Sequence, residues 1–323
     1  MEQRVLGRSG IKVSPMGLGC WAIGGQFYMD GKIDGYGQTD DKESIKAIHA
    51  ALDLGVNFLD TSDAYGVGHS EAVIGEALEG RRNQAVIATK FGYLGNEATK
   101  TLCGYNLEPD YVERACDASL RRLRTDYIDL YQLHVWEVGI SELDSVMDTL
   151  DRLVEIGKIR TYGWSTDLLS GIKLIAQNDN CSAIQQEFSI IKGDERIIGF
   201  CEDNNLASIN RSPLAMGLLT GKFGRDTRVS NNDVRGSGYS WAKHIFVDGK
   251  PNEDAYRKLE AVRDIFTSEG RTLAQGALAW IWGKSNVTIP IPGFKSVKQV
   301  EENIRAMEFG PLTAKQMQEL EDL

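Results

Sequence analysis

Four polar side chains at the ends of predicted strands are the residues of this sequence best suited to chemistry. Asp60 ends one apolar run, and Tyr65 follows it five residues later. Lys90 ends the next apolar run, and His134 ends a third. A Lys ammonium group beside a phenol stabilises the phenolate, so we expect the pKa of Tyr65 to be lowered toward neutrality. The carboxylate would hold the ammonium group, and a neutral His134 could donate to a carbonyl oxygen. The set predicts proton exchange with a carbonyl or an alcohol.

Each of these residues also has a purely structural interpretation when it is taken alone. Lys90 and Asp60 could form a simple salt bridge, His134 could be a satisfied core residue, and Tyr65 could be a packed aromatic. Their occurrence at the ends of three consecutive predicted strands favours a shared site.

The elements that must position these side chains alternate regularly along the chain. Hydrophobic periodicity predicts strands at 16–19, 57–60, 85–89, 127–133, 159–165, 183–187, 206–212 and 287–291. It predicts helices at 40–54, 70–78, 109–123, 142–155, 168–176, 195–204, 253–269 with 273–282, and 297–306. Eight such units predict an α/β fold, a (β/α)8 TIM barrel, preceded by a β-hairpin at 5–14.

A barrel of this kind brings the C-terminal ends of its strands to one face, where the four side chains would converge. Two segments that follow strand ends, 92–108 and 224–252, are longer than a barrel connection needs. We expect them to be long loops that form walls or lids at this face. Since no linker or repeat interrupts the chain, a single domain over residues 1–323 is predicted.

Composition argues against several classes of function. Lys and Arg number 36 and Asp and Glu 46, for a net charge of −10, whereas nucleic acids and anionic membranes need clustered basic charge. The five cysteines include no C-x-x-C pair, and no ligand spacing suggests a metal. No signal-peptide pattern or membrane-length apolar run is found, so a cytoplasmic protein is expected.

Two other cofactor motifs occur but lack the context they need. The run Gly17 to Ala22 fits the G-x-G-x-x-A dinucleotide fingerprint, yet the next helix is predicted only from about residue 40. Tyr28 and Lys32, like Tyr239 and Lys243, have the Tyr-x-x-x-Lys spacing of short-chain dehydrogenases but lie in predicted loops. We therefore set both interpretations aside.

Several stretches together, spread over nearly the whole chain, resemble the aldo-keto reductase family. They are residues 17–21, 57–65, 68–71, 89–90, 129–134, 163–165, 185–189, 212–214 through 221–222, and 289–290 through 303. The resemblance implies a (β/α)8 barrel that uses NADP to transfer a hydride between the nicotinamide and a carbonyl or alcohol, namely an aldehyde, ketone or sugar. It also implies that Asp60, Tyr65, Lys90 and His134 form the catalytic tetrad, with Tyr65 as general acid/base.

The same resemblance implies a cofactor site and a substrate pocket. Ser165 and Gln185 would hold the nicotinamide carboxamide beside Thr166, which stands where the family usually has Asn. The pyrophosphate loop would comprise Ser212, Leu214, Gly217, Leu219, Gly221 and Lys222, and the adenosine-phosphate site Gly293, Phe294, Lys295, Ser296, Gln299, Glu302 and Asn303. A helix N-terminus with a Lys and a Ser hydroxyl suits a phosphate. Trp21 and Trp136 are expected to line the substrate pocket.

Arg211 departs from the family pattern, because many members have an aromatic residue before the Ser-Pro-Leu run. Its planar guanidinium could stack on the nicotinamide ring. It could instead turn away and pair with an acidic residue.

Two other functions remain open at this stage. The protein could be mainly an oxidative sugar or alcohol dehydrogenase, or a cofactor-binding regulatory subunit resembling the β-subunits of potassium channels.

Overall fold

The centre of the molecule is a curved eight-stranded sheet. The computed structural model describes residues 2–323. Its strands follow the order β16-β13-β12-β11-β10-β7-β6-β3, and every neighbouring pair is parallel. A bridge between Gly19 and Gly293 brings the two edge strands together. The nearly closed barrel that this produces confirms the predicted fold class.

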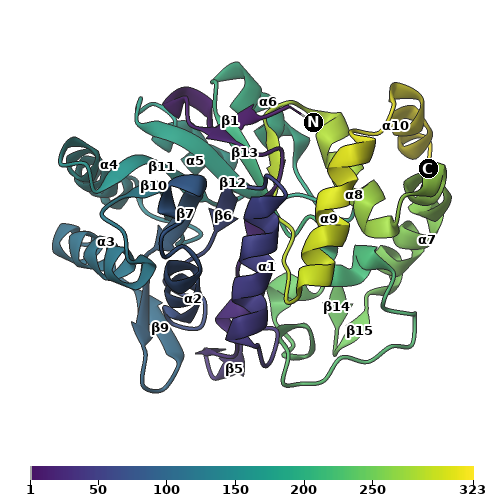
Figure 1. Cartoon of the computed structure of the whole chain (residues 1–323), viewed down its shortest axis with the longest axis horizontal. Coiled ribbons are helices and arrows are strands. Elements are labelled where there is room, and N and C mark those ends of the chain that lie inside the picture. The colour runs from purple at the N-terminus through teal and green to yellow at the C-terminus, as the bar shows by residue number, and fades with distance from the viewer. Residues whose placement is uncertain (1) are drawn as a thin grey trace.

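The barrel strands are short, and helices follow them in alternation (Figure 1). The strands are β3 (Gly17–Gly19), β6 (Phe58–Asp60), β7 (Val86–Phe91), β10 (Ile128–Leu133), β11 (Ile159–Ser165), β12 (Cys181–Glu187), β13 (Ala207–Arg211) and β16 (Thr288–Pro290). The helices are α1 (Asp41–Asp53), α2 (His69–Ala77), α3 (Pro109–Leu123), α4 (Ile140–Glu155), α5 (Leu169–Ile175), α6 (Glu195–Asp203), α7 (Glu253–Thr267), α8 (Leu273–Lys284), α9 (Val297–Phe309) and α10 (Ala314–Glu321). The first and last barrel helices, α1 and α9, lie side by side.

A short hairpin closes one end of the barrel and leaves the other end for the site. Strands β1 (Arg4–Val5) and β2 (Lys12–Val13) pair antiparallel, as predicted. Leu6 and Val13 are fully buried and pack with Val86 and Ala207, the first residues of β7 and β13. The hairpin therefore covers the N-terminal ends of the strands. In Figure 1 it lies opposite β5, β9, β14 and β15.

The two long connections lie at the predicted face of the barrel and contain short strands and turns. The first contains β8 (Tyr93–Asn96) and β9 (Thr101–Tyr105), and β9 pairs with the hairpin of β4 (Tyr28–Met29) and β5 (Lys32–Ile33). The second contains three short elements, η5 (Val234–Gly236), η6 (Ser240–Ala242) and the hairpin of β14 (Phe246–Val247) and β15 (Lys250–Pro251). Ser237 Oγ in this segment donates to the Ile33 carbonyl at 2.7 Å. The two connections thus meet over the open end of the barrel through the β4–β5 hairpin.

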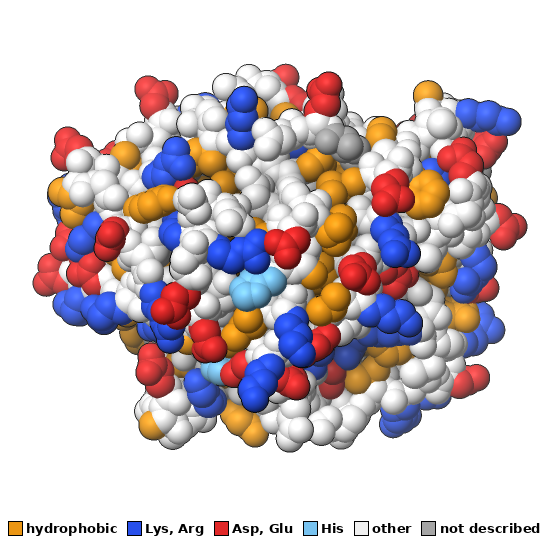
Figure 2. Space-filling model, in the orientation of Figure 1, with side chains coloured by type: hydrophobic (Ala, Val, Ile, Leu, Met, Phe, Trp, Pro, Cys, Tyr) orange, Lys and Arg blue, Asp and Glu red, His pale blue; other side chains and the backbone are white. Residues whose placement is uncertain are grey.

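The C-terminal helix α10 was not predicted, although its start carries a helix signal. Thr313 caps the helix, and Gln316 returns a hydrogen bond to the capping residue. No helix within residues 2–323 is long and apolar enough to cross a membrane. Basic and acidic side chains are intermixed over the face displayed in Figure 2.

Candidate active site

The four residues singled out at strand ends come together at the open end of the barrel. The Lys90 ammonium group lies at the centre of the set and is fully buried. It donates to Asp60 Oδ1 at 2.6 Å and to the Tyr65 hydroxyl at 3.0 Å. Its third hydrogen bond, of 2.8 Å, goes to the Thr61 carbonyl. The His134 ring stands edge-on to the Tyr65 ring, with 5.9 Å between the ring centroids.

Two glutamines fix the remaining oxygen of Asp60. Gln132 Nε2 donates to Asp60 Oδ2 at 3.1 Å, and Gln185 Nε2 donates to the same atom at 2.7 Å. All three residues are buried. Gln132 was missed by sequence reasoning, although it lies on β10 two residues before His134, where the alternation of a strand points both side chains the same way. The Asp60 carboxylate is thus held in a single orientation beneath Lys90.

Burial decides the protonation of the phenol. Burial raises the pKa of Tyr65. The charge of Lys90 acts to lower this pKa, and the Asp60 carboxylate acts to raise it further. The expectation that the pKa of Tyr65 is lowered is wrong for this structure, because burial, with the Asp60 carboxylate adding to it, outweighs the charge of Lys90. The phenol is therefore protonated at neutral pH and is poised as a proton donor.

His134 is held neutral for related reasons. Burial lowers its pKa well below the ordinary value, and the positive charges of Lys90 and Arg211 act in the same direction. Its Nδ1 atom lies 3.0 Å from Ser62 Oγ. A neutral imidazole can serve as a hydrogen-bond donor to a carbonyl oxygen without carrying charge.

Aromatic rings form one wall beside Tyr65. The Trp21 ring is stacked against the Tyr65 ring with 6.0 Å between their centroids. Tyr36 and Trp241 contact the Trp21 ring from other sides, at centroid separations of 5.0 and 6.1 Å. Trp21 Nε1 is buried and has no hydrogen-bond partner within residues 2–323. The pocket role of Trp21 stays a prediction.

Three cations gather beyond the seventh barrel strand. Lys222 was expected in the pyrophosphate loop and Lys295 at the adenosine-phosphate site, and the structure adds Arg235 from η5. Burial and the nearby charges of Arg235 and Lys295 lower the pKa of Lys222. Arg235 pairs with Asp233 at 2.6 Å and donates to the Met216 carbonyl at 3.2 Å. Three positive charges against one carboxylate make this cluster a suitable place for phosphate groups.

The backbone of the predicted pyrophosphate loop is wound through left-handed conformations. Ser212, Ala215 and Met216 have φ values of 54°, 46° and 52°, which are uncommon for residues other than glycine. Gly217 and Gly221 have φ values of 90° and 75°. Such clusters of left-handed residues are typical of functional loops. Leu214 and Leu219, which were expected to contact the pyrophosphate, are buried.

The predicted adenosine-phosphate site differs in detail from expectation. Lys295 Nζ donates to the Tyr36 and Gln38 carbonyls at 2.5 and 2.9 Å. Ser296 caps α9 by accepting from the Gln299 amide. The Val297 amide at the start of α9 donates to Glu43 Oε1 at 3.0 Å, so one of the expected free amides is already occupied.

The other residues expected at this site surround the start of α9. The Gln299 side chain accepts from the Lys295 amide at 2.7 Å, and the Glu302 carbonyl accepts from Gln275 at 3.0 Å. Asn303 and Phe294 are buried, while Gly293 bridges to β3.

Comparison with known proteins decides the family. A sequence profile of the Aldo/keto reductase family matches residues 15–323. The chain belongs to the aldo/keto reductase family. It is 34% identical over 305 residues to the aldo-keto reductase yakc [NADP(+)] of Schizosaccharomyces pombe, covering 91% of this chain and 84% of that protein.

Solved structures of aldo-keto reductases and related dehydrogenases share the fold. A glycerol dehydrogenase from Gluconobacter oxydans matches with a TM-score of 0.83 and 29% identity, covering 99% of this chain and 94% of that one. The holo form of an aldo-keto reductase from Bacillus halodurans matches with a TM-score of 0.79 and 29% identity, covering 100% of this chain and 96% of that one.

Some residues that the family resemblance assigned to the nicotinamide are engaged within the protein. The Gln185 amide nitrogen is committed to Asp60 and to Gln132 Oε1. Ser165 Oγ lies 3.5 Å from Gln185 Oε1. Thr166, which replaces the usual Asn of aldo-keto reductases, is fully buried and donates to the Trp136 carbonyl at 2.8 Å, so its hydroxyl donor is taken.

The sequence left two arrangements open for Arg211, stacking on the nicotinamide or pairing with an acidic residue, and the structure has the ion pair. Its guanidinium pairs with Asp167 at 2.9 Å and with Glu187 at 3.8 Å. The guanidinium carbon also lies 5.6 Å from the centre of the Trp136 ring, which is 43% exposed. Arg211 thus cross-links the ends of neighbouring strands and places Trp136 at the mouth.

We expect Arg211→Tyr to change the Kd values of oxidised and reduced NADP by the same factor, because the guanidinium is held by Asp167 and Glu187. The substitution should lower the free energy of unfolding by about 1–3 kcal/mol, since both carboxylates lose a partner. Cofactor titration and denaturant unfolding measure the two effects. A selective tightening of the oxidised form would instead support a cation lying on the nicotinamide.

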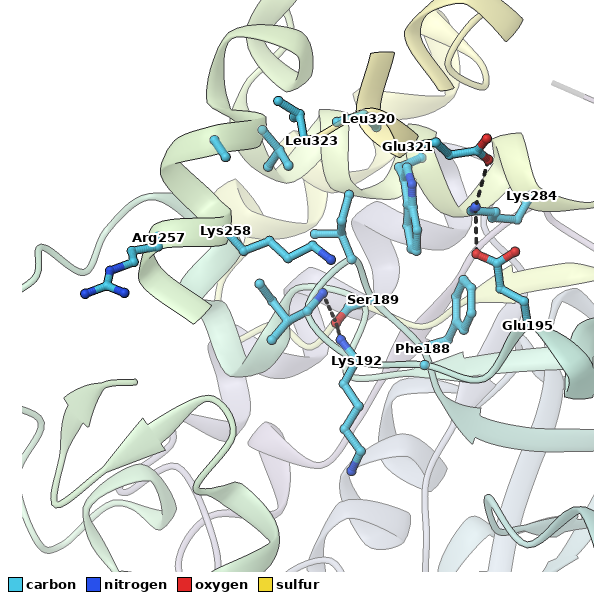
Figure 3. A pocket seen from close by; sticks show the side chains of 16 residues that line it. Phe188, Ser189, Lys192, Glu195, Arg257, Lys258, Lys284, Leu320, Glu321 and Leu323 are labelled. Carbon is cyan, nitrogen blue, oxygen red and sulfur yellow. Dashed lines mark hydrogen bonds and ion pairs between the residues drawn. The ribbon is translucent and has the colours of Figure 1, made fainter. Parts of the chain in front are cut away.

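A separate groove lies away from the tetrad. Its volume is 630 Å³, and it is lined by residues that follow β12, by α7 and α8, and by the C-terminal residues. Figure 3 shows Lys284 between Glu195 and Glu321, with Lys192 and Lys258 farther along the groove. The groove contains none of the four tetrad residues. Among residues 2–323 no cluster of His, Cys, Asp and Glu side chains could hold a metal ion.

Proposed function

We propose that this member of the aldo/keto reductase family is an NADP(H)-dependent oxidoreductase that interconverts a carbonyl and an alcohol. The observation that carries the proposal is the buried Lys90 ammonium group, which bonds Asp60 and the Tyr65 hydroxyl at the open end of the barrel. When bound, the nicotinamide supplies or accepts the hydride. We further propose that residues 1–323 work as one domain.

The four residues divide the remaining work in carbonyl reduction. The Tyr65 hydroxyl donates its proton to the oxygen as negative charge develops there. Lys90 stabilises the phenolate that remains, because it is 3.0 Å away and stays charged. His134 donates to the same substrate oxygen and fixes its direction. In alcohol oxidation the phenolate takes the proton back.

The chain's own residues fit a phosphorylated cofactor. Lys222, Arg235 and Lys295 place positive charge beside the left-handed loop at Ser212 to Gly221. The printed name of the fission yeast relative includes NADP(+). We infer that the cluster holds the phosphates, with Lys295 nearest the 2′-phosphate.

We infer carbonyl reduction as the first candidate direction of the reaction. A protonated Tyr65 is the proton donor that carbonyl reduction uses at neutral pH. The similarity to a glycerol dehydrogenase keeps polyol or sugar oxidation as the second candidate. Trp21, with its unpaired N–H group, suits a hydroxylated substrate in either direction.

Turnover of a substrate panel tests the proposal. Aldehydes, ketones and sugars are mixed with NADPH or NADH, and the matching alcohols with the oxidised cofactors. We expect multiple turnovers with at least one carbonyl and higher kcat/KM with NADPH. Cofactor binding without turnover on any substrate would favour the regulatory-subunit alternative.

The pKa of His134 predicts how reduction responds to acid. Because that pKa lies well below its ordinary value, the imidazole stays neutral as the pH falls from about 7 to about 6. We therefore expect kcat for carbonyl reduction to stay constant over this range. A twofold loss near pH 6.5 would show that His134 titrates normally.

A further inference from the structure

A chain of hydrogen bonds leads from His134 away from the reaction centre. His134 Nδ1 lies 3.0 Å from Ser62 Oγ, and Ser62 Oγ lies 3.2 Å from Asp63 Oδ1. The Ala64 amide donates to the same Ser62 oxygen at 3.1 Å. His134 Nε2 has no partner within residues 2–323, and it is the ring nitrogen left to face a substrate. None of this was visible in the sequence, because Ser62 and Asp63 were read only as part of the loop before Tyr65.

The far end of this chain reaches the surface on the other side of the loop. Asp63 is half-buried and lines a cavity of 180 Å³ together with Tyr93, Tyr111 and Arg122. The cavity contains neither Tyr65 nor Lys90. Asp63 can therefore exchange a proton with water without passing through the substrate site.

Ser62 can satisfy its hydrogen bonds in two ways. When Asp63 is ionised, Ser62 donates to the carboxylate and accepts from His134 Nδ1–H, which leaves Nε2 as an acceptor. When Asp63 is protonated, it donates to Ser62, and Ser62 donates to Nδ1, so the ring proton resides on Nε2. In both states Ser62 Oγ donates once and accepts twice, counting the Ala64 amide, so neither leaves it unsatisfied.

We propose that Asp63 is a positioning residue that selects the tautomer of His134 through Ser62, and that only protonated Asp63 gives the Nε2–H donor needed for carbonyl reduction. The consequence for catalysis rests on the proposed function, whereas the tautomer switch itself does not. The switch takes up or releases one proton in total: Asp63 exchanges it with water, the ring loses a proton at one nitrogen and gains one from water at the other, and the imidazole is neutral in both states.

The surroundings of Asp63 place this switch in an accessible pH range. Burial raises the pKa of Asp63 to about 8, and the nearby Glu71 carboxylate adds to the effect. Arg122 opposes it, but this guanidinium is shared with Glu71 at 2.7 Å and Glu97 at 3.5 Å. The titratable groups that face or line this region are Glu71 of α2, Tyr111, Arg114 and Arg122 of α3, Tyr131 of β10, and Tyr93 and Glu97 at β8.

The tautomer can be observed directly by ¹⁵N NMR of histidine-labelled protein, without any substrate. The chain has four histidines, and the spectrum of His134→Gln assigns the signals of His134. We expect the protonated nitrogen to change from Nε2 to Nδ1 as the pH rises from about 7 to about 9, around the raised pKa of Asp63. In Asp63→Asn, whose amide remains a donor to Ser62, the proton should stay on Nε2 throughout.

Kinetics supply the second readout. In the wild type, kcat for carbonyl reduction should fall about tenfold or more over the same pH range, as one donor to the developing negative charge is lost. Asp63→Asn should hold the low-pH rate without this step. Glu108→Gln, which removes an exposed acid outside this cavity, should keep the wild-type profile.

Different outcomes separate the two proposals. An unchanged His134 tautomer in the wild type between about pH 7 and 9 overturns the switch, as does a change that persists in Asp63→Asn. A switch seen by NMR in a protein that turns over no carbonyl would leave the switch standing and reject the proposed function.

Discussion

Replacing Tyr65 by Phe should lower the rate of carbonyl reduction by roughly 10²–10⁴-fold while the cofactor still binds. The Tyr65 hydroxyl accepts a hydrogen bond from Lys90 Nζ at 3.0 Å and carries the proton for the substrate. The Tyr65 ring lies against both Trp21 and His134. Phe preserves the ring and its packing but has no proton to donate. The loss should therefore appear in kcat, with little change in the Kd for NADPH.

Single-turnover kinetics with saturating NADPH measure this chemical step, and fluorescence titration measures cofactor binding. Tyr105→Phe is a matched control, since Tyr105 is a 48% exposed residue of β9 away from Lys90. Turnover of Tyr65→Phe within tenfold of the wild type would remove Tyr65 from the acid/base role.

Replacing Lys295 by Ala should raise the Kd for NADPH by roughly 10–150-fold and leave the Kd for NADH nearly unchanged. A charge-assisted bond to phosphate contributes about 1.5–3 kcal/mol, which corresponds to this range. Two of the three ammonium hydrogens of Lys295 already reach the Tyr36 and Gln38 carbonyls, which holds the charge in place. One hydrogen remains for a phosphate oxygen.

Lys298→Ala provides the control, because Lys298 is an exposed residue in the first turn of α9. Glu43→Gln should tighten NADPH more than NADH, since the Glu43 carboxylate occupies the N-terminus of α9 at 3.0 Å from the Val297 amide. Equal losses of both cofactors in Lys295→Ala would show that Lys295 does not read the 2′-phosphate.

The barrel and its tetrad could be predicted because both follow from local pattern. Eight apolar runs alternate with amphipathic segments, and parallel strands bring their C-terminal ends to one face. Asp60, Lys90 and His134 each end such a run, so their convergence required no knowledge of the loops. The structure brings them together with Tyr65 as expected.

The rest of the site depends on contacts between residues far apart in the chain. Arg235 was one of several arginines in a long segment, and nothing local shows that it meets Met216 and Lys222. Glu43 accepts a hydrogen bond from the Val297 amide of α9, 254 residues away in the sequence, and no pattern in either segment predicts this contact. The direction of the Tyr65 pKa shift likewise depends on burial, which the sequence does not give.

Two missed hairpins did carry a signal. Asp30-Gly31 and Asp248-Gly249 both have positive φ at each residue, as a tight two-residue hairpin turn requires. The flanking strands are only two residues long, so alternation alone could not reveal them.

Transfer of deuterium from labelled NADPH to product tests the central claim most directly. The wild type is incubated with reduced cofactor deuterated at the nicotinamide carbon that reacts and with a carbonyl substrate from the panel, and the product alcohol is analysed by mass spectrometry. The account predicts deuterium at the former carbonyl carbon with the wild type and almost none with Tyr65→Phe. Bound cofactor without label transfer, or label transfer undiminished in Tyr65→Phe, would contradict it.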